Sequence, residues 1–242
     1  MNKNPLELFD EIFCIGSSEE KIKKIEKDLS DQGVKKTIQV QKIGITVNKV
    51  EDIFVGQGVN QAVLMIAKQV VEKNLESCLV IEENTKIKKC SEDIFLEIAI
   101  KSIKDRPWEI IRLSYNLCTH VEDHLNQISH NYIKFKPRKK MGYIYGTNMW
   151  AMSRAAAIKL LKEFSLCWNQ KGNLVKSDES SEAVLLSPNI FGVWASLNME
   201  NYLYAPMVAY PLDEAGKNVY KENYKKWKKE AWIARNIIMP KV

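Results

Sequence analysis

Two carboxylates and one carboxamide follow a short apolar run in the first half of the chain. Residues 78–81 are apolar throughout, and Glu82, Glu83 and Asn84 come directly after them. In an open α/β sheet ligands collect at the carboxyl ends of the strands, so polar residues at such a point are the first candidates for a binding site. Oxygen atoms of these types could hold Mg²⁺ or Mn²⁺ together with a diphosphate. Acidic turn residues after a strand are also commonplace, and on the triplet alone that structural interpretation is the stronger one.

Strand and helix patterns alternate around this triplet. The sequence predicts strands at 11–15, 37–43, 77–81 and 108–113, and helices at about 18–32, 60–73 and 92–104. In the first helix, apolar residues recur every three or four positions, and Gly33 supplies its C-terminal stop. Such alternation is typical of an α/β domain with a mostly parallel sheet. Further along, strands are predicted near 132–135 and 142–152, followed by a helix at about 154–164.

Three segments of the chain, taken in their order along the sequence, match the pattern of a known family. They are IFCI at 12–15 followed by Glu20 and Lys21, LVIEEN at 79–84, and YGTNMWAMSRAAAIKLL at 145–161. Together they resemble the glycosyltransferase family of lipopolysaccharide biosynthesis that also contains collagen galactosyltransferases. The third segment is the most specific match, with its Gly-Thr strand, Ser-Arg cap and Ala-Lys-Leu-Leu helix. Weaker similarity extends over roughly residues 10–210 and includes Asp178.

The resemblance implies the fold called GT-A. The chain is then expected to be α/β: one domain over 1–242 with a mostly parallel twisted sheet, helices on both faces and a smaller second lobe. Its parts would be a nucleotide-binding half at 1–115, an acceptor half at 116–212 and a basic C-terminal helix at 213–242.

The resemblance also implies roles for particular residues. The nucleotide sugar would be bordered by Cys14, Ile15, Gly16, Lys21, Glu82, Gly146, Thr147 and Asn148. Glu83 and Asn84 would hold Mn²⁺ or Mg²⁺. Asp178 would be the general base for the acceptor hydroxyl, with Glu179 and Glu182 behind it. All of this requires that the acidic triplet and the Gly-Thr-Asn segment open into the same cleft.

The implied activity is transfer of a sugar, with inversion, from a nucleotide diphosphate to a hydroxyl group of a glycan or other acceptor. The chain departs from the family pattern at three places. Asn84 replaces an aspartate, Ser17 and Ser18 replace arginines, and the helix from residue 60 lacks a Ser-His pair. A metal-independent transferase, or a degenerate binding or scaffold module that keeps the fold, therefore stays open as an alternative.

Charge and cysteine content bound the remaining possibilities. The net charge is +6, and lysines and arginines cluster at 134–140 and 217–229. Either cluster could meet phosphate or an anionic membrane, or could simply be a solvated face, and nucleic-acid binding is not predicted. The five cysteines are widely spaced, which favours free thiols. Without a secretory start or a run of about 20 apolar residues, a cytoplasmic location is expected, with peripheral membrane contact through the basic C-terminus as an option.

Overall fold

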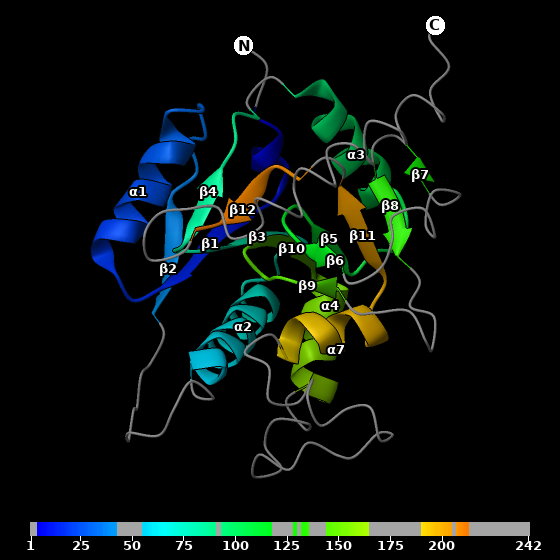
Figure 1. The fold of residues 1–242 in the computed structure, drawn as a ribbon. Coiled ribbons are helices and arrows are strands. Elements are labelled where there is room, and N and C mark those ends of the chain that lie inside the picture. Colours follow the sequence, from blue (N-terminus) through cyan, green and yellow to red (C-terminus); the bar gives the residue numbers. More distant parts are fainter. Residues whose placement is uncertain are drawn as a thin grey trace, which may run out of the picture.

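The computed structural model describes residues 4–42, 55–90, 93–117, 128–129, 132–135, 144–164, 190–204 and 207–212. Over these residues the centre is an eight-stranded sheet with helices on both sides (Figure 1). Its strands, in spatial order, are β2 (Ile38–Lys42), β1 (Glu11–Gly16), β3 (Ser77–Glu82), β10 (Met149–Ser153), β5 (Ile110–Arg112), β11 (Asn201–Tyr204), β8 (Tyr132–Phe135) and β7 (Ile128–Ser129).

The sheet is mixed, but most of its strands share one direction. β2, β1 and β3 are parallel to one another, and β5 is parallel to β11. β10 runs antiparallel to both β3 and β5, and β8 runs antiparallel to β11 and β7. Only β10 and β8 therefore oppose the other six strands of this sheet, which confirms the prediction of a mostly parallel sheet. Two small antiparallel pairs lie beside it: β4 (Thr85–Ile87) with β12 (Ala209–Pro211), and β6 (Asn116–Leu117) with β9 (Ile144–Tyr145).

The helices divide between the two faces of the sheet. The described helices are η1 (Pro5–Leu8), α1 (Glu19–Ser30), α2 (Val55–Glu72), α3 (Ile94–Lys104), α4 (Arg154–Lys159), the π-helical turn η4 (Leu160–Phe164) and α7 (Ile190–Asn198). Buried residues of η1, α1 and α3 belong to one core cluster, and those of α2, α4, η4 and α7 belong to a second. Figure 1 shows α2, α4 and α7 grouped on one side of the sheet.

Strand β1 shows how the sequence fills both cores. Ile12 and Cys14 belong to the first cluster, whereas Phe13 and Ile15 belong to the second. Successive side chains of a strand point to opposite faces, so a strand covered on both sides is apolar throughout. Full burial of each large apolar side chain stabilises the fold by about 1.5–3 kcal/mol.

Local signals begin and end the helices much as the sequence predicts. Ser18 caps α1 by accepting a hydrogen bond from the Lys21 backbone N–H, and Gly33 takes a φ of +78° just after the helix. Helix α2 is the main difference, because it begins at Val55 rather than at residue 60. The predicted helix at 154–164 is α-helical to Lys159 and π-helical beyond it.

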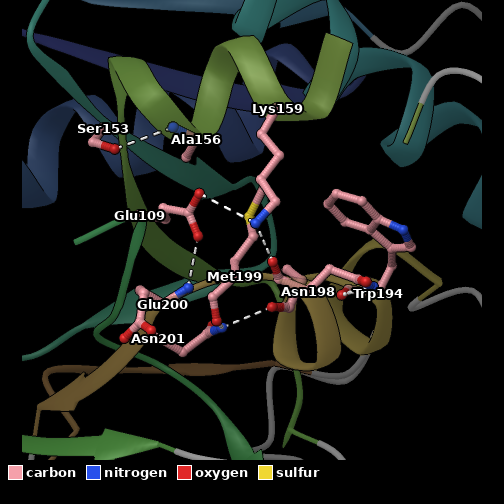
Figure 2. Close-up of polar contacts among 10 residues, drawn as sticks. Glu109, Ser153, Ala156, Lys159, Trp194, Asn198, Met199, Glu200 and Asn201 are labelled. Carbon is pink, nitrogen blue, oxygen red and sulfur yellow. Dashed lines mark hydrogen bonds and ion pairs between the residues drawn. The ribbon is translucent and has the colours of Figure 1, made fainter. Parts of the chain in front are cut away.

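A polar bracket fixes α7 against α4 and the start of β5 (Figure 2). The Lys159 ammonium donates to the carbonyl of Asn198 and lies 3.4 Å from the Glu109 carboxylate. Glu109 in turn accepts a hydrogen bond of 2.7 Å from the Glu200 backbone N–H. The C-terminal end of α7 is therefore tied to the strands that it covers.

The two predicted halves are interleaved in the sheet. Strand β10 comes from the predicted acceptor half, yet it lies between β3 and β5 of the predicted nucleotide-binding half. None of the described helices has the length and apolar character needed to cross a membrane.

Candidate active site

The acidic triplet and the Gly-Thr-Asn segment meet at one edge of the sheet. Because β1 and β3 are parallel neighbours, Ile15 stands beside Glu82, and the Glu83 backbone N–H donates to the Ile15 carbonyl at 2.9 Å. Strand β10 is antiparallel to β3, so the residues that precede it lie at the carboxyl end of β3. The Glu82 backbone N–H accordingly donates to the Asn148 carbonyl at 2.8 Å. The acidic triplet and the Gly-Thr-Asn segment are therefore direct neighbours.

Glu82 is held by the turn before β10. The Thr147 hydroxyl donates to Oε1 of Glu82, and Nδ2 of Asn148 donates to Oε2 at 3.3 Å. Burial raises the pKa of Glu82; the hydrogen bond from Thr147 opposes this shift, and the Glu83 carboxylate adds to it. With both oxygens accepting from side chains, this carboxylate is suited to fixing the turn.

Glu83 turns the other way, toward the start of α1. Its Oε2 accepts hydrogen bonds from the backbone N–H groups of Ser17, at 2.8 Å, and Ser18, at 2.7 Å. Ser18 is the N-cap of α1 and Ser17 precedes it; the N-terminal end of a helix attracts anions, so a carboxylate is well placed there. Gly16 makes this approach possible, since a Cβ at that position would lie only 2.5 Å from Oε2 of Glu83.

Asn84 accepts hydrogen bonds from two other segments, one through its side chain and one through its carbonyl. Its Oδ1 accepts from Nδ2 of Asn148 at 3.2 Å, and its carbonyl accepts from the Leu212 backbone N–H at 2.7 Å. The Thr85 hydroxyl donates to the Asn148 carbonyl at 3.0 Å. Asn148 is thus bonded to Glu82, Asn84 and Thr85, which makes it the centre of the site's hydrogen bonds.

Arg112 fixes the beginning of the same turn, and the sequence argument missed it. Gly146 has a φ of +88°, a conformation that favours glycine, and its carbonyl accepts from Nη1 of Arg112 at 3.1 Å. Nε donates to Oδ1 of Asn201 at 3.0 Å and Nη2 to the Gly192 carbonyl at 2.8 Å. Burial lowers the pKa of Arg112 to about 9, so the guanidinium keeps its charge near neutral pH. The signal that could have found it is an arginine flanked by Ile110, Ile111 and Leu113 in the predicted strand.

The other predicted site residues take less part in these contacts or lie outside the described residues. The side chains of Cys14 and Ile15 are buried in the two cores, and the Ile15 carbonyl contacts the site by accepting from the Glu83 backbone N–H. Lys21 lies exposed on the first turn of α1. The predicted base Asp178 lies outside the described residues, as do Glu179 and Glu182.

The described residues do not fit a divalent cation held by Glu83 and Asn84. In the described part of the chain, no group of three or more His, Cys, Asp or Glu side chains is arranged to hold a metal ion. Oε2 of Glu83 and Oδ1 of Asn84 accept hydrogen bonds from different parts of the protein. A cation bound through these two oxygens would therefore compete with their present hydrogen bonds.

Comparison with known proteins gives distant likenesses to solved structures. No protein-family model matches the chain, and no curated protein matches it. Three similar solved structures are a mannose-1-phosphate geranyltransferase from Thermus thermophilus (TM-score 0.40, 10% identity, covering 80% of this chain and 73% of that one), a glycosyltransferase involved in glycosylation of the major capsid of PBCV-1 (TM-score 0.38, 8% identity, 81% and 94%) and CMP:2-keto-3-deoxy-manno-octonic acid synthetase in complex with CTP (TM-score 0.39, 10% identity, 94% and 100%). Likenesses at this distance assign neither a family nor an activity to the chain.

Proposed function

We propose that the chain is a GT-A-like glycosyltransferase that moves a sugar from a nucleotide diphosphate to a hydroxyl group of a glycan or other acceptor. The observation that carries the proposal is the meeting of three polar segments at the carboxyl ends of β1 and β3, where an open α/β sheet binds its ligands. The same three segments carry the family resemblance.

In this reaction the acceptor oxygen attacks the anomeric carbon of the donor sugar. The acceptor's O–H proton passes to a base, a new C–O bond forms, and the bond to phosphate breaks with its electron pair leaving on the nucleoside diphosphate. A sugar hydroxyl is a poor nucleophile until its proton is removed, so a carboxylate must lie near it. Asp178 is the proposed base, with Glu179 and Glu182 as the next candidates.

Glu82 has a different part in the proposal. Its two oxygens already accept from Thr147 and Asn148, so it is a positioning residue that sets the shape of the Gly146–Asn148 turn. The sugar or the acceptor would lie against this turn, because Thr147 and Asn148 lie beside the carboxyl end of β3.

Release of nucleoside diphosphate tests the proposal. The full chain is incubated with a panel of nucleotide sugars and hydroxyl acceptors, in buffers with and without Mn²⁺. We expect release with at least one donor, and a loss of roughly tenfold or more in Thr147→Val, whose turn loses its bond to Glu82. Thr37→Val is the matched control, because Thr37 is exposed in the segment before β2. No release with any donor, or equal loss in both variants, would contradict the proposal.

A binding or scaffold module without turnover is the second candidate. The observation that favours it is Asn84, an amide where the family has a carboxylate, with its oxygen taken by Asn148. Calorimetry separates the two candidates: heat of binding for a nucleotide sugar, with no product after long incubation, supports the module.

Peripheral membrane contact through residues 213–242 is compatible with either candidate. This basic segment would bind anionic lipid through charge alone. Pelleting with phosphatidylserine vesicles at low and high salt tests it, and binding that does not weaken with salt would contradict a charge-driven contact.

A further inference from the structure

The hydrogen bonds of the acidic triplet differ from those of a cation site. In a cation site, neighbouring oxygen ligands turn toward one common point and give their lone pairs to the ion. Here the side chains of Glu82, Glu83 and Asn84 each accept hydrogen bonds from the protein, and they do so from two separate segments. The triplet is already engaged without an ion.

The direction of Glu83 is the strongest of these observations. Its carboxylate lies on the N–H groups of Ser17 and Ser18, at 2.8 and 2.7 Å, where hydrogen bonds to an ionised acceptor are short and strong. Gly16 provides the space for it, since a Cβ there would come within 2.7 Å of the Glu83 Cβ as well as 2.5 Å of its Oε2. Close approach of this kind depends on residue 16 having no side chain.

The amide of Asn148 supplies the second observation. One nitrogen, Nδ2, donates to both Oε2 of Glu82, at 3.3 Å, and Oδ1 of Asn84, at 3.2 Å. A primary amide has two N–H donors, so both bonds can be made at once. This nitrogen bridges two oxygens of the triplet, which is the task that a cation would otherwise perform.

We propose that Glu82, Glu83 and Asn84 form a hydrogen-bonded clamp joining the turn after β1, the end of β3 and the turn before β10, and that this site binds its ligand without a divalent cation. Glu83 fastens the first turn, Glu82 fastens the last, and Asn84 shares Asn148 with Glu82. The hydrogen-bonded clamp does not depend on whether the chain transfers sugar. The inference that a nucleotide-sugar donor binds there without a divalent cation rests on the proposed function.

The sign of a stability change distinguishes a clamp from an empty cation site. Without an ion, carboxylates gathered to hold one repel each other, so removing one stabilises the protein. If the triplet is a clamp, removing one carboxylate instead breaks charge-assisted hydrogen bonds and destabilises the protein. In EDTA we expect Glu83→Gln to lower Tm by about 2–4 °C and Glu83→Ala by about 4–8 °C. Glu163→Gln, at an exposed position of η4, should change Tm by less than about 1 °C. A rise in Tm for Glu83→Gln would overturn the proposal.

Direct binding of Mn²⁺ gives a second readout that needs no activity. The full chain is titrated with MnCl₂ alone, and free Mn²⁺ is followed by electron paramagnetic resonance. Either no binding up to about 1 mM, or binding that Glu83→Gln leaves unchanged, supports the proposal. One bound ion whose affinity falls tenfold or more in Glu83→Gln overturns it.

Both measurements use the protein with no ligand or with the ion alone. Their outcome is therefore independent of the nucleotide-sugar assay. Failure to release nucleoside diphosphate would go against the proposed function and leave the clamp intact.

Discussion

Gly16 has no side chain, and this lets the Glu83 carboxylate lie against the main chain at the end of β1. A residue that looks like an ordinary strand-ending glycine is therefore linked to a carboxylate 67 positions later. Arg112 also joins distant parts of the chain. Its buried guanidinium donates hydrogen bonds to Gly146, Gly192 and Asn201, which lie in three different segments. At this scale the site depends on a few close polar contacts, each of which can be tested by one substitution.

Gly16→Ala should break the contact between the first turn and Glu83. The added Cβ forces the carboxylate away from Ser17 and Ser18, and we expect the free energy of unfolding to fall by about 1–3 kcal/mol in urea titrations. Adding Glu83→Gln to this variant should then cost little more, because the two changes remove the same contact. Additive losses would show that the two residues do not act together.

The buried thiols should be unreactive in the folded state. Burial is the largest cause that raises the pKa of Cys14 and of Cys90 to about 12, from an ordinary 9.0, and it also raises the pKa of Cys78. Since the thiolate is the reactive form, alkylation of these three cysteines between pH 7 and pH 9 should be far slower in the native chain than in the unfolded chain at the same pH. Peptide mapping after iodoacetamide treatment measures each cysteine separately. Rapid native labelling of Cys14 near pH 8 would contradict the expectation.

Helix α7 is an element held at both ends. The Gly192 carbonyl in its first turn accepts a hydrogen bond from Nη2 of Arg112. The Asn198 carbonyl in its last turn accepts a hydrogen bond from Lys159, as Figure 2 shows. Because Arg112 also holds the Gly146 carbonyl, the position of α7 is coupled to the turn that forms one side of the candidate site. Movement of this helix would therefore reach the site through one guanidinium.

Lys159→Met should loosen α7 without emptying the core beneath it. The variant loses the ion pair with Glu109 and the cation at the C-terminal end of the helix, for about 1 kcal/mol. The matched control is Lys162→Met, since Lys162 is an exposed residue of η4. Unfolding in urea compares the two, and equal midpoints would show that the bracket adds no stability.

For the whole molecule, periodicity and strand patterns were enough to predict an α/β fold with a mostly parallel sheet. Strand β3 and helix α1 follow their local signals closely, because apolar runs and capping residues act over a few positions. The placement of β10 between β3 and β5 could not be predicted in the same way, since strand order depends on pairing between distant segments. For the same reason the approach of Glu83 to Gly16, and the contacts of Arg112, were out of reach of local patterns. The predicted roles of Asp178 and the basic C-terminus stay predictions.

The insertion of β10 also bears on how the protein is made. During synthesis β1, β2 and β3 emerge early, but the open edge of β3 has to wait for Met149–Ser153, nearly 70 residues later, before it gains its second neighbour. An unpaired apolar edge is a template for wrong association with other chains. A nascent chain stalled before residue 149 is therefore the form of this protein most in need of a chaperone.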